Sequence, residues 1–114
     1  MLDFNVYTYL ANIYVVSWGV GMKRDLVFSA GILSLLEGWM DPLGADHYDI
    51  VSHFLEDADP LEESEHAVLN ENVSYHVDLL ESADLIRRNS QSGDETMYYA
   101  LTWAGHDYLD DSNR

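Results

Sequence analysis

The sequence predicts a mainly helical domain that carries a small β-hairpin, and three observations support this prediction. Apolar residues recur at helical spacing in three segments between residues 22 and 84. The period then changes to that of strands, in two runs separated by the hairpin signal QSGD at 91–94. A short amphipathic segment closes the chain. The order helix, helix, helix, hairpin, helix indicates a winged helix-turn-helix: mainly α with a β-hairpin wing.

The first helix should begin near Asp25, because aspartate favours the capping position of a helix N-terminus. The stretch 41–46 contains Pro42 and Gly44 and is a turn signal. A short second helix is expected at 47–57. The apolar residues expected to face inward are Leu26, Ile32, Leu33, Leu36 and Trp39 in the first helix, and Tyr48, Val51, Phe54 and Leu55 in the second.

The third helix is expected at 70–84, after a polar and acidic connector, with Asn70 or Asn72 as its cap. At about 100° per residue, one side of this helix is apolar and should face inward. The closing helix should bring its own apolar residues against the first and third helices. The inward residues are Val73, Val77 and Leu80, and Trp103, Tyr108 and Leu109 are expected near Leu80 and Ile32.

Residues 1–21 are interpreted as an amino-terminal extension. Two runs rich in Val, Ile and Tyr flank Ala11-Asn12 and favour a strand or hairpin, with a single helix as the alternative. We expect the aromatic side chains of this segment to be at least partly buried. The predicted organisation is therefore an extension at 1–21, a winged-helix domain at 22–111 and a tail at 112–114.

Three stretches resemble one family more closely than the order of elements alone would require. They are MKRDL at 22–26, VSYHVDLLESADLI at 73–86 and LTWAGHDYLDD at 101–111. Together they resemble an uncharacterised winged-helix family of bacteria, phages and mobile elements, a domain of unknown function. Its pattern is an MKRD-like start, an I-S-Y-H-x-x-L-L-x-E-A-G-L-I helix and an L-T-W-x-G-H-x-F-L-D end. The resemblance implies a fold and a mobile-element context, and it transfers no catalytic residue.

Two positions depart from the pattern of that family. Family members usually begin at the position of Met22, so residues 1–21 are either an added element or read-through of upstream sequence. Asp84 stands where the family usually has Gly. A residue with a side chain disfavours the left-handed cap that usually ends this helix.

The distribution of charge limits the classes of partner. The formal net charge is −16, and residues 25–86 contain fifteen Asp and Glu but no Lys or Arg. Such a surface repels phosphate backbones and anionic membranes, and it attracts basic surfaces. Adaptation to high salt is the alternative explanation, since acidic surfaces poor in lysine are general under that condition.

Several classes of protein are disfavoured by what the sequence lacks. Cysteine is absent, and no segment reaches the roughly 18 apolar residues that span a bilayer. No nucleophile motif, P-loop or dinucleotide fingerprint appears. We expect a non-enzymatic protein without cofactor or metal. We expect it in the cytoplasm, which is that of the host if a phage encodes the protein.

The histidines and the second helix offer only weak site patterns. Asp49, His53 and Asp57 share a helix face at i,i+4 spacing, close to His47, but we interpret them as a solvated acidic face rather than a metal site. His76 is expected to be buried and bonded to the closing segment. His106 is expected to pair with the acid four residues later or to cap the closing helix.

The outward side of the third helix carries the functional hypothesis. In a DNA-binding winged helix this side presents Lys and Arg to phosphates, whereas here it presents carboxylates. We expect it to bind a basic protein surface, for example as a nucleic-acid mimic that inhibits a host defence complex, as anti-CRISPR proteins do, or a DNA-processing complex. The candidate partner-binding residues are Glu71, Tyr75, Asp78, Glu81 and Ser82 on the helix, and Glu56, Asp57, Asp59, Glu62, Glu63 and Glu65 on the connector.

Two alternatives to this hypothesis stay open. The first is a DNA-binding transcriptional regulator that contacts DNA through the wing and the MKR stretch, with Arg87, Arg88, Lys23 and Arg24. The second is a homo-oligomer built on the aromatic extension at 1–21.

Overall fold

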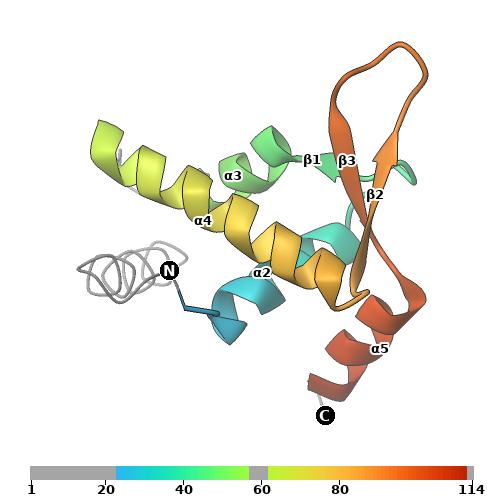
Figure 1. Ribbon diagram of the computed structural model, residues 1–114. Coiled ribbons are helices and arrows are strands. Elements are labelled where there is room, and N and C mark those ends of the chain that lie inside the picture. The colour runs from blue at the N-terminus through green and yellow to red at the C-terminus, as the bar shows by residue number, and fades with distance from the viewer. Residues whose placement is uncertain (1–22, 57–61, 113–114) are drawn as a thin grey trace.

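The computed structural model describes residues 23–56 and 62–112, which form four helices and a small antiparallel sheet (Figure 1). The extension expected at 1–21 lies outside the described residues, as do residues 113–114 of the tail. In chain order the elements are α2 (Leu26–Glu37), β1 (Ala45–Asp46), α3 (His47–Leu55), α4 (Glu63–Ser82), β2 (Ile86–Ser90), β3 (Met97–Leu101) and α5 (Trp103–Ser112).

The strands β2 and β3 form the predicted hairpin, which projects beyond the helices (Figure 1). Its turn is closed by a hydrogen bond of 3.1 Å from the Asp94 N–H to the Gln91 carbonyl oxygen. The sheet order is β1-β3-β2, so a third strand pairs with β3 on the side away from β2. This third strand was not predicted: part of the stretch 41–46, expected to be a turn, is β1. The mainly helical architecture with a three-stranded antiparallel sheet is compatible with a winged-helix-like fold.

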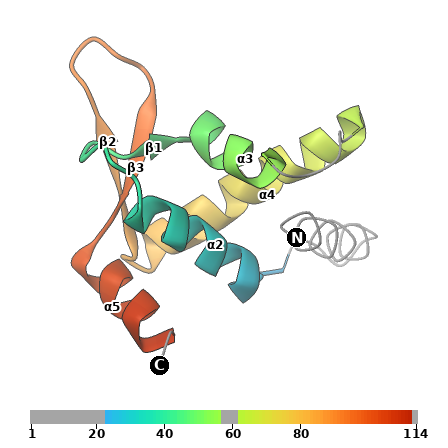
Figure 2. The same cartoon turned by 180° about the vertical axis from the view of Figure 1, so that it is seen from behind.

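The core lies between α4 on one side and α2 and α3 on the other, as the front and back views show (Figures 1 and 2). The sheet closes one end of this helical layer, and α5 packs beside α2. The predicted inward residues of α4 are confirmed as buried. The buried apolar residues are Phe28, Ile32, Leu33, Leu36, Ala45, Ile50, Val51, Leu69, Val73, Val77, Leu80, Ile86, Leu101 and Leu109.

The helix α2 begins as predicted, because the Asp25 carboxylate accepts hydrogen bonds from the backbone N–H groups of Val27 and Phe28 at 2.9 and 3.0 Å. Two residues expected to face inward are exposed instead, Leu26 in α2 and Tyr48 in α3. Both lie in the first turn of their helix. The faces that are buried run through Phe28 and Ile32 in α2 and through Ile50 and Val51 in α3, so the first-turn residues point away from the core.

The helix α4 begins at Glu63, seven residues before the predicted start at 70. The acidic connector therefore supplies its first turns, and the prediction of an asparagine cap at 70 or 72 was wrong. Acidic side chains suit a helix N-terminus because they meet its unpaired N–H groups and its positive dipole end. Here the Glu65 carboxylate accepts a hydrogen bond of 3.0 Å from the Glu62 N–H. Asn72, the other residue considered as a cap, is fully buried in the helix interior.

The end of α4 differs from the prediction that Asp84 disfavours a left-handed cap. Asp84 adopts the left-handed conformation, with φ 62°, although a residue other than glycine disfavours it. The Leu85 N–H donates to the Leu80 carbonyl and the Asp84 N–H to the Glu81 carbonyl, both at 3.0 Å. These two bonds are the pattern of a Schellman motif. The usual cap of the helix is therefore kept with aspartate in the glycine position.

The helix α5 is fixed by small polar contacts at its start. The Thr102 hydroxyl donates to the Asp84 carbonyl oxygen and accepts a hydrogen bond of 3.0 Å from the Gly105 N–H. A Cβ atom on Gly105 would overlap the Leu85 carbonyl oxygen, so the close contact between α5 and the end of α4 requires glycine here. Leu109 is buried in the core as predicted.

Tyr108 packs against the core, as predicted, but Trp103 does not: 84% of its surface is exposed. Leu109 lies six positions after Trp103, which places the two side chains about 120° apart on the helix. Burying Leu109 therefore turns Trp103 outward.

Within 23–56 and 62–112, no helix is both long and apolar enough to cross a bilayer.

Candidate functional site

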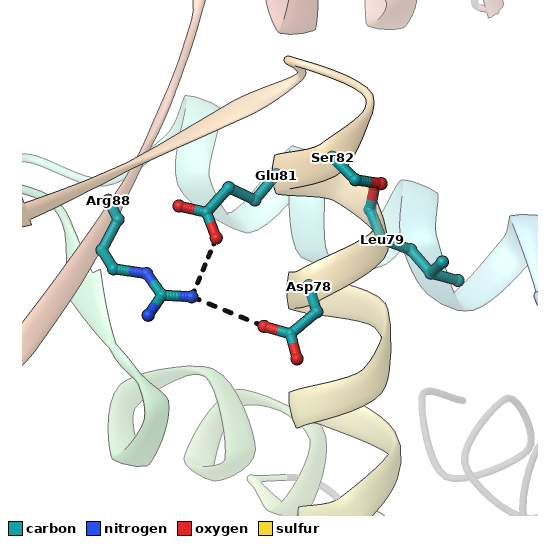
Figure 3. Close-up of polar contacts among 5 residues, drawn as sticks. All are labelled: Asp78, Leu79, Glu81, Ser82 and Arg88. Carbon is teal, nitrogen blue, oxygen red and sulfur yellow. Dashed lines mark hydrogen bonds and ion pairs between the residues drawn. The ribbon is translucent and has the colours of Figure 1, made fainter.

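Arg88 is the centre of a charged cluster between the hairpin and α4 (Figure 3). Its guanidinium contacts the carboxylates of Glu81 at 2.8 Å and of Asp78 at 3.4 Å. It also lies 5.6 Å from the ring centre of Tyr99, its partner across the β2–β3 ladder. The outward side of α4 has no Lys or Arg of its own, and Arg88 on β2 places a positive charge against it.

This cluster changes the electrostatics of α4 without contributing much to stability. The side chains are exposed at 39% for Arg88 and 72% for Asp78, where ion pairs are screened by water and salt. Exposed pairs of this kind stabilise a fold by about 0–1 kcal/mol. The contacts nevertheless occupy the guanidinium and partly neutralise the two carboxylates. The unbalanced negative charge of α4 therefore lies farther toward its N-terminus.

The remaining predicted contact residues on α4 differ in how available they are. Glu71 is exposed and has no ion pair within the described residues. Tyr75 is half-buried, with its ring edge-on to His76 at 5.3 Å between centroids. The Ser82 hydroxyl is exposed but donates a hydrogen bond of 2.6 Å to the Leu79 carbonyl. Glu71 is thus the carboxylate on this face that is most available to a partner.

Three of the predicted acidic contact residues lie at the start of α4, with Glu62 just before its first residue and Glu63 and Glu65 in its first turn. Glu62 and Glu63 are exposed, whereas Glu65 is half-buried and accepts the hydrogen bond from the Glu62 N–H. Glu56, after the end of α3, is exposed. Asp57 and Asp59, also predicted to bind the partner, lie outside the described residues.

The four basic residues considered as DNA contacts are not brought together. Arg87 and Arg88 lie on β2, and Arg87 is exposed. Lys23 and Arg24 are exposed just before α2, at the end of that helix far from the hairpin (Figure 1).

His76 is buried, as predicted. Two of its hydrogen bonds are made with α4 and the start of α2, and not with the closing segment as expected. Its Nδ1–H donates to the Asn72 carbonyl oxygen, and its Nε2 accepts from the Asp25 N–H, both at 2.9 Å. The ring also meets Phe28 edge-on at 5.1 Å. Burial lowers the pKa of His76, which keeps the imidazole neutral and able to accept at Nε2. The histidine thereby joins the middle of α4 to the start of α2.

Two residues of the weak metal pattern, Asp49 and His47, make local contacts in the structure. Asp46 and Asp49 form a capping box at the start of α3, in which each carboxylate accepts from the other residue's N–H at 2.8 and 3.1 Å. His47 Nε2 lies 3.1 Å from the amide oxygen of Asn70, and His53 is exposed.

His106 was expected to pair within α5 or to cap it. Its Nδ1 lies instead 3.1 Å from a carboxylate oxygen of Glu37 on α2. The contact joins α5 to the end of α2, on the surface of the protein.

Comparison with known proteins assigns a family but no activity. No curated protein and no solved structure matches the chain. A family described as hypothetical protein, DUF2513, matches residues 48–114, a range that holds α4, the hairpin and α5. This agrees with the expected resemblance to an uncharacterised family. The match covers more than half of the chain, and the protein belongs to the DUF2513 family, a family of unknown function.

Proposed function

We propose that the protein is a non-enzymatic winged-helix protein that binds a basic surface of a protein partner through the exposed face of α4. The observation that carries this proposal is the charge of that face. From Glu63 to Ser82 the helix has no Lys or Arg, and the cation that reaches it within the described residues is Arg88. The element order and the sheet order β1-β3-β2 support the winged-helix assignment.

The geometry favours a protein partner over DNA. A helix lying in a major groove approaches one phosphate charge per about 1.7 Å of duplex, and carboxylates there would be repelled. Arg88, which would otherwise face DNA from the wing, already contacts Glu81 and Asp78. A basic surface that normally holds nucleic acid, such as that of a host defence or DNA-processing complex, has the complementary charge. A phage or mobile-element origin would suit such a role.

Reversing the charge of Glu71 should weaken the complex more than reversing a charge elsewhere. The partner is first captured from host lysate on the immobilised full chain and identified, and its affinity for purified variants is then measured. We expect Glu71→Lys to lower affinity by about tenfold, mainly through slower association, since like charge replaces attraction. The loss should shrink as salt rises, because exposed charges are screened over about 8 Å at physiological ionic strength.

Glu95→Lys is the matched control, because Glu95 is also exposed and lies in the wing turn, away from α4. It alters net charge by the same amount. Equal losses in both variants would mean that net charge alone drives binding, and no loss in either would exclude the α4 face.

The exposed Arg87 supports a second candidate, a DNA-binding regulator that works through the wing. A regulator of this kind should retard duplex DNA in a gel at low salt, and Arg87→Gln should abolish the shift. An acidic mimic should instead leave the DNA unshifted and displace it from the basic partner.

A further inference from the structure

The indole of Trp103 does not pack in the core. The residue stands in the first turn of α5 with 84% of its surface exposed. The contacts that hold α5 in place come from other residues. Thr102 caps the helix, Gly105 allows its close approach, Tyr108 and Leu109 pack in the core, and His106 contacts Glu37. An indole is the largest apolar surface that a side chain can offer, and tryptophan is enriched at protein interfaces.

The surroundings of the indole are acidic. Asp107 is exposed one helical turn after Trp103, on the same side of α5. Asp84 is exposed just after the end of α4. Its carbonyl oxygen accepts the hydrogen bond from Thr102, the residue before Trp103. His106, also one turn along α5, contacts the Glu37 carboxylate. The segment Trp103–Ser112 itself contains no Lys or Arg.

We propose that Trp103 is the receptor for a Lys or Arg side chain on a basic peptide segment of a protein partner. The cation would lie over the face of the indole, the aromatic ring that attracts cations best, with Asp84 and Asp107 supplying the flanking negative charge. In the part of the chain that the structure describes, the cation–π contact present is Arg88 over Tyr99, which leaves the indole of Trp103 uncovered. An exposed aromatic anchor among polar residues is also the usual composition of an interface hot spot.

This surface goes beyond the α4 face and does not depend on it. The kind of partner is the same, a basic protein, but here it would contact α5. Tyr75, the aromatic residue among the candidate contacts on α4, is half-buried against His76, whereas Trp103 is 84% exposed. Of the two aromatic side chains, the one at the start of α5 is therefore the more accessible to a partner.

Tyr48 provides a matched control. It is also an exposed aromatic near two acids in the first turn of a helix, with 76% of its surface exposed. The neighbouring carboxylates of Asp46 and Asp49, however, are turned onto backbone N–H groups in their capping box. They are therefore less free to flank a bound cation than Asp84 and Asp107.

The test is binding of fluorescein-labelled peptides to the full chain by fluorescence anisotropy at physiological salt. The probe is an arginine–glycine repeat peptide, and the same peptide with citrulline in place of arginine removes the charge but keeps the shape. We expect Trp103→Ala to weaken binding of the arginine peptide roughly three- to tenfold. Trp103→Phe should retain part of the affinity, Tyr48→Ala should retain all of it, and the citrulline peptide should bind weakly to every variant. Thermal unfolding should show Trp103→Ala as stable as the parent chain.

Other outcomes would overturn the proposal. Unchanged binding in Trp103→Ala would show that the peptide reads net charge alone. Equal losses in Trp103→Ala and Tyr48→Ala would show that any exposed aromatic ring binds the peptide and that Trp103 is not a specific receptor. Strong binding of the citrulline peptide would show an apolar rather than a cationic ligand. Glu71→Lys, measured alongside, separates the two surfaces, because a loss in Trp103→Ala without one in Glu71→Lys supports this site while it contradicts the α4 face.

Discussion

Replacing Gly44 with Ala should lower the free energy of unfolding by about 3–5 kcal/mol, as backbone strain and steric overlap act at the same residue. Gly44 precedes β1 and has φ 114°, a conformation that residues with a side chain rarely adopt. A Cβ atom there would also overlap the backbone of Tyr99 on β3. The variant must therefore distort its backbone and move β1 away from β3. Denaturant unfolding followed by circular dichroism measures the loss.

Two other glycines separate the strain from the overlap. Gly93 in the hairpin turn has φ 82° but open space around it, so Gly93→Ala should show the strain alone, about 1 kcal/mol. Gly38 has neither feature, since a Cβ atom there would make an ordinary contact at 3.8 Å, and Gly38→Ala should be nearly neutral. A Gly44→Ala protein no less stable than Gly93→Ala would contradict the packing of β1 on β3.

The second large effect is a loss of stability on mild acidification, carried by His76. Burial lowers the pKa of His76 in the folded protein, whereas the unfolded chain keeps the ordinary pKa of about 6.5. The unfolded state therefore binds the proton more readily. The stabilising contribution of His76 is full above about pH 6.5 and is lost as pH falls below it, at up to about 1.4 kcal/mol per pH unit. Protonation would place a donor at Nε2 facing the Asp25 N–H.

His76→Gln tests this effect because glutamine cannot titrate. We expect it to cost about 1–3 kcal/mol at neutral pH, from the loss of the two hydrogen bonds of the imidazole, and to flatten the stability profile below about pH 6.5. His106→Gln is the matched control, because it replaces an exposed histidine of a surface contact and keeps both hydrogen bonds of His76. A slope that persists in His76→Gln would assign the acid sensitivity to another group.

The helices and the hairpin were predictable because their signals are local. Asp25 indicates the start of α2, and the spacing of Val73, Val77 and Leu80 identifies the buried side of α4. The signal QSGD places the turn between β2 and β3. The outward position of Trp103 could also have been found, because six residues from Leu109 is not a helical repeat.

Other features depend on partners that the sequence does not bring together. The strand β1 has two residues and no alternating pattern, so it exists only through its pairing with β3. Asp84 is held left-handed by the Schellman bonds on either side of it. The contact of Arg88 with Asp78 and Glu81 needs the hairpin to fold back along α4. The acidic face of α4 was therefore predicted, but its partial neutralisation was not.

The carboxylates that accept backbone N–H bonds have a consequence for redesigning this protein. In the described part of the chain, many acids serve the local fold as caps and turn anchors: Asp25, Asp41, Asp46, Asp49, Glu65 and Asp94. Others, such as Glu63, Glu71 and Glu95, are exposed without such a bond. The acids therefore form two sets, of which only the first is needed for the local fold. Charge can be removed from the second set without the loss of a helix cap, whereas uniform replacement of the acids would remove the caps and unfold the chain before its binding could be measured.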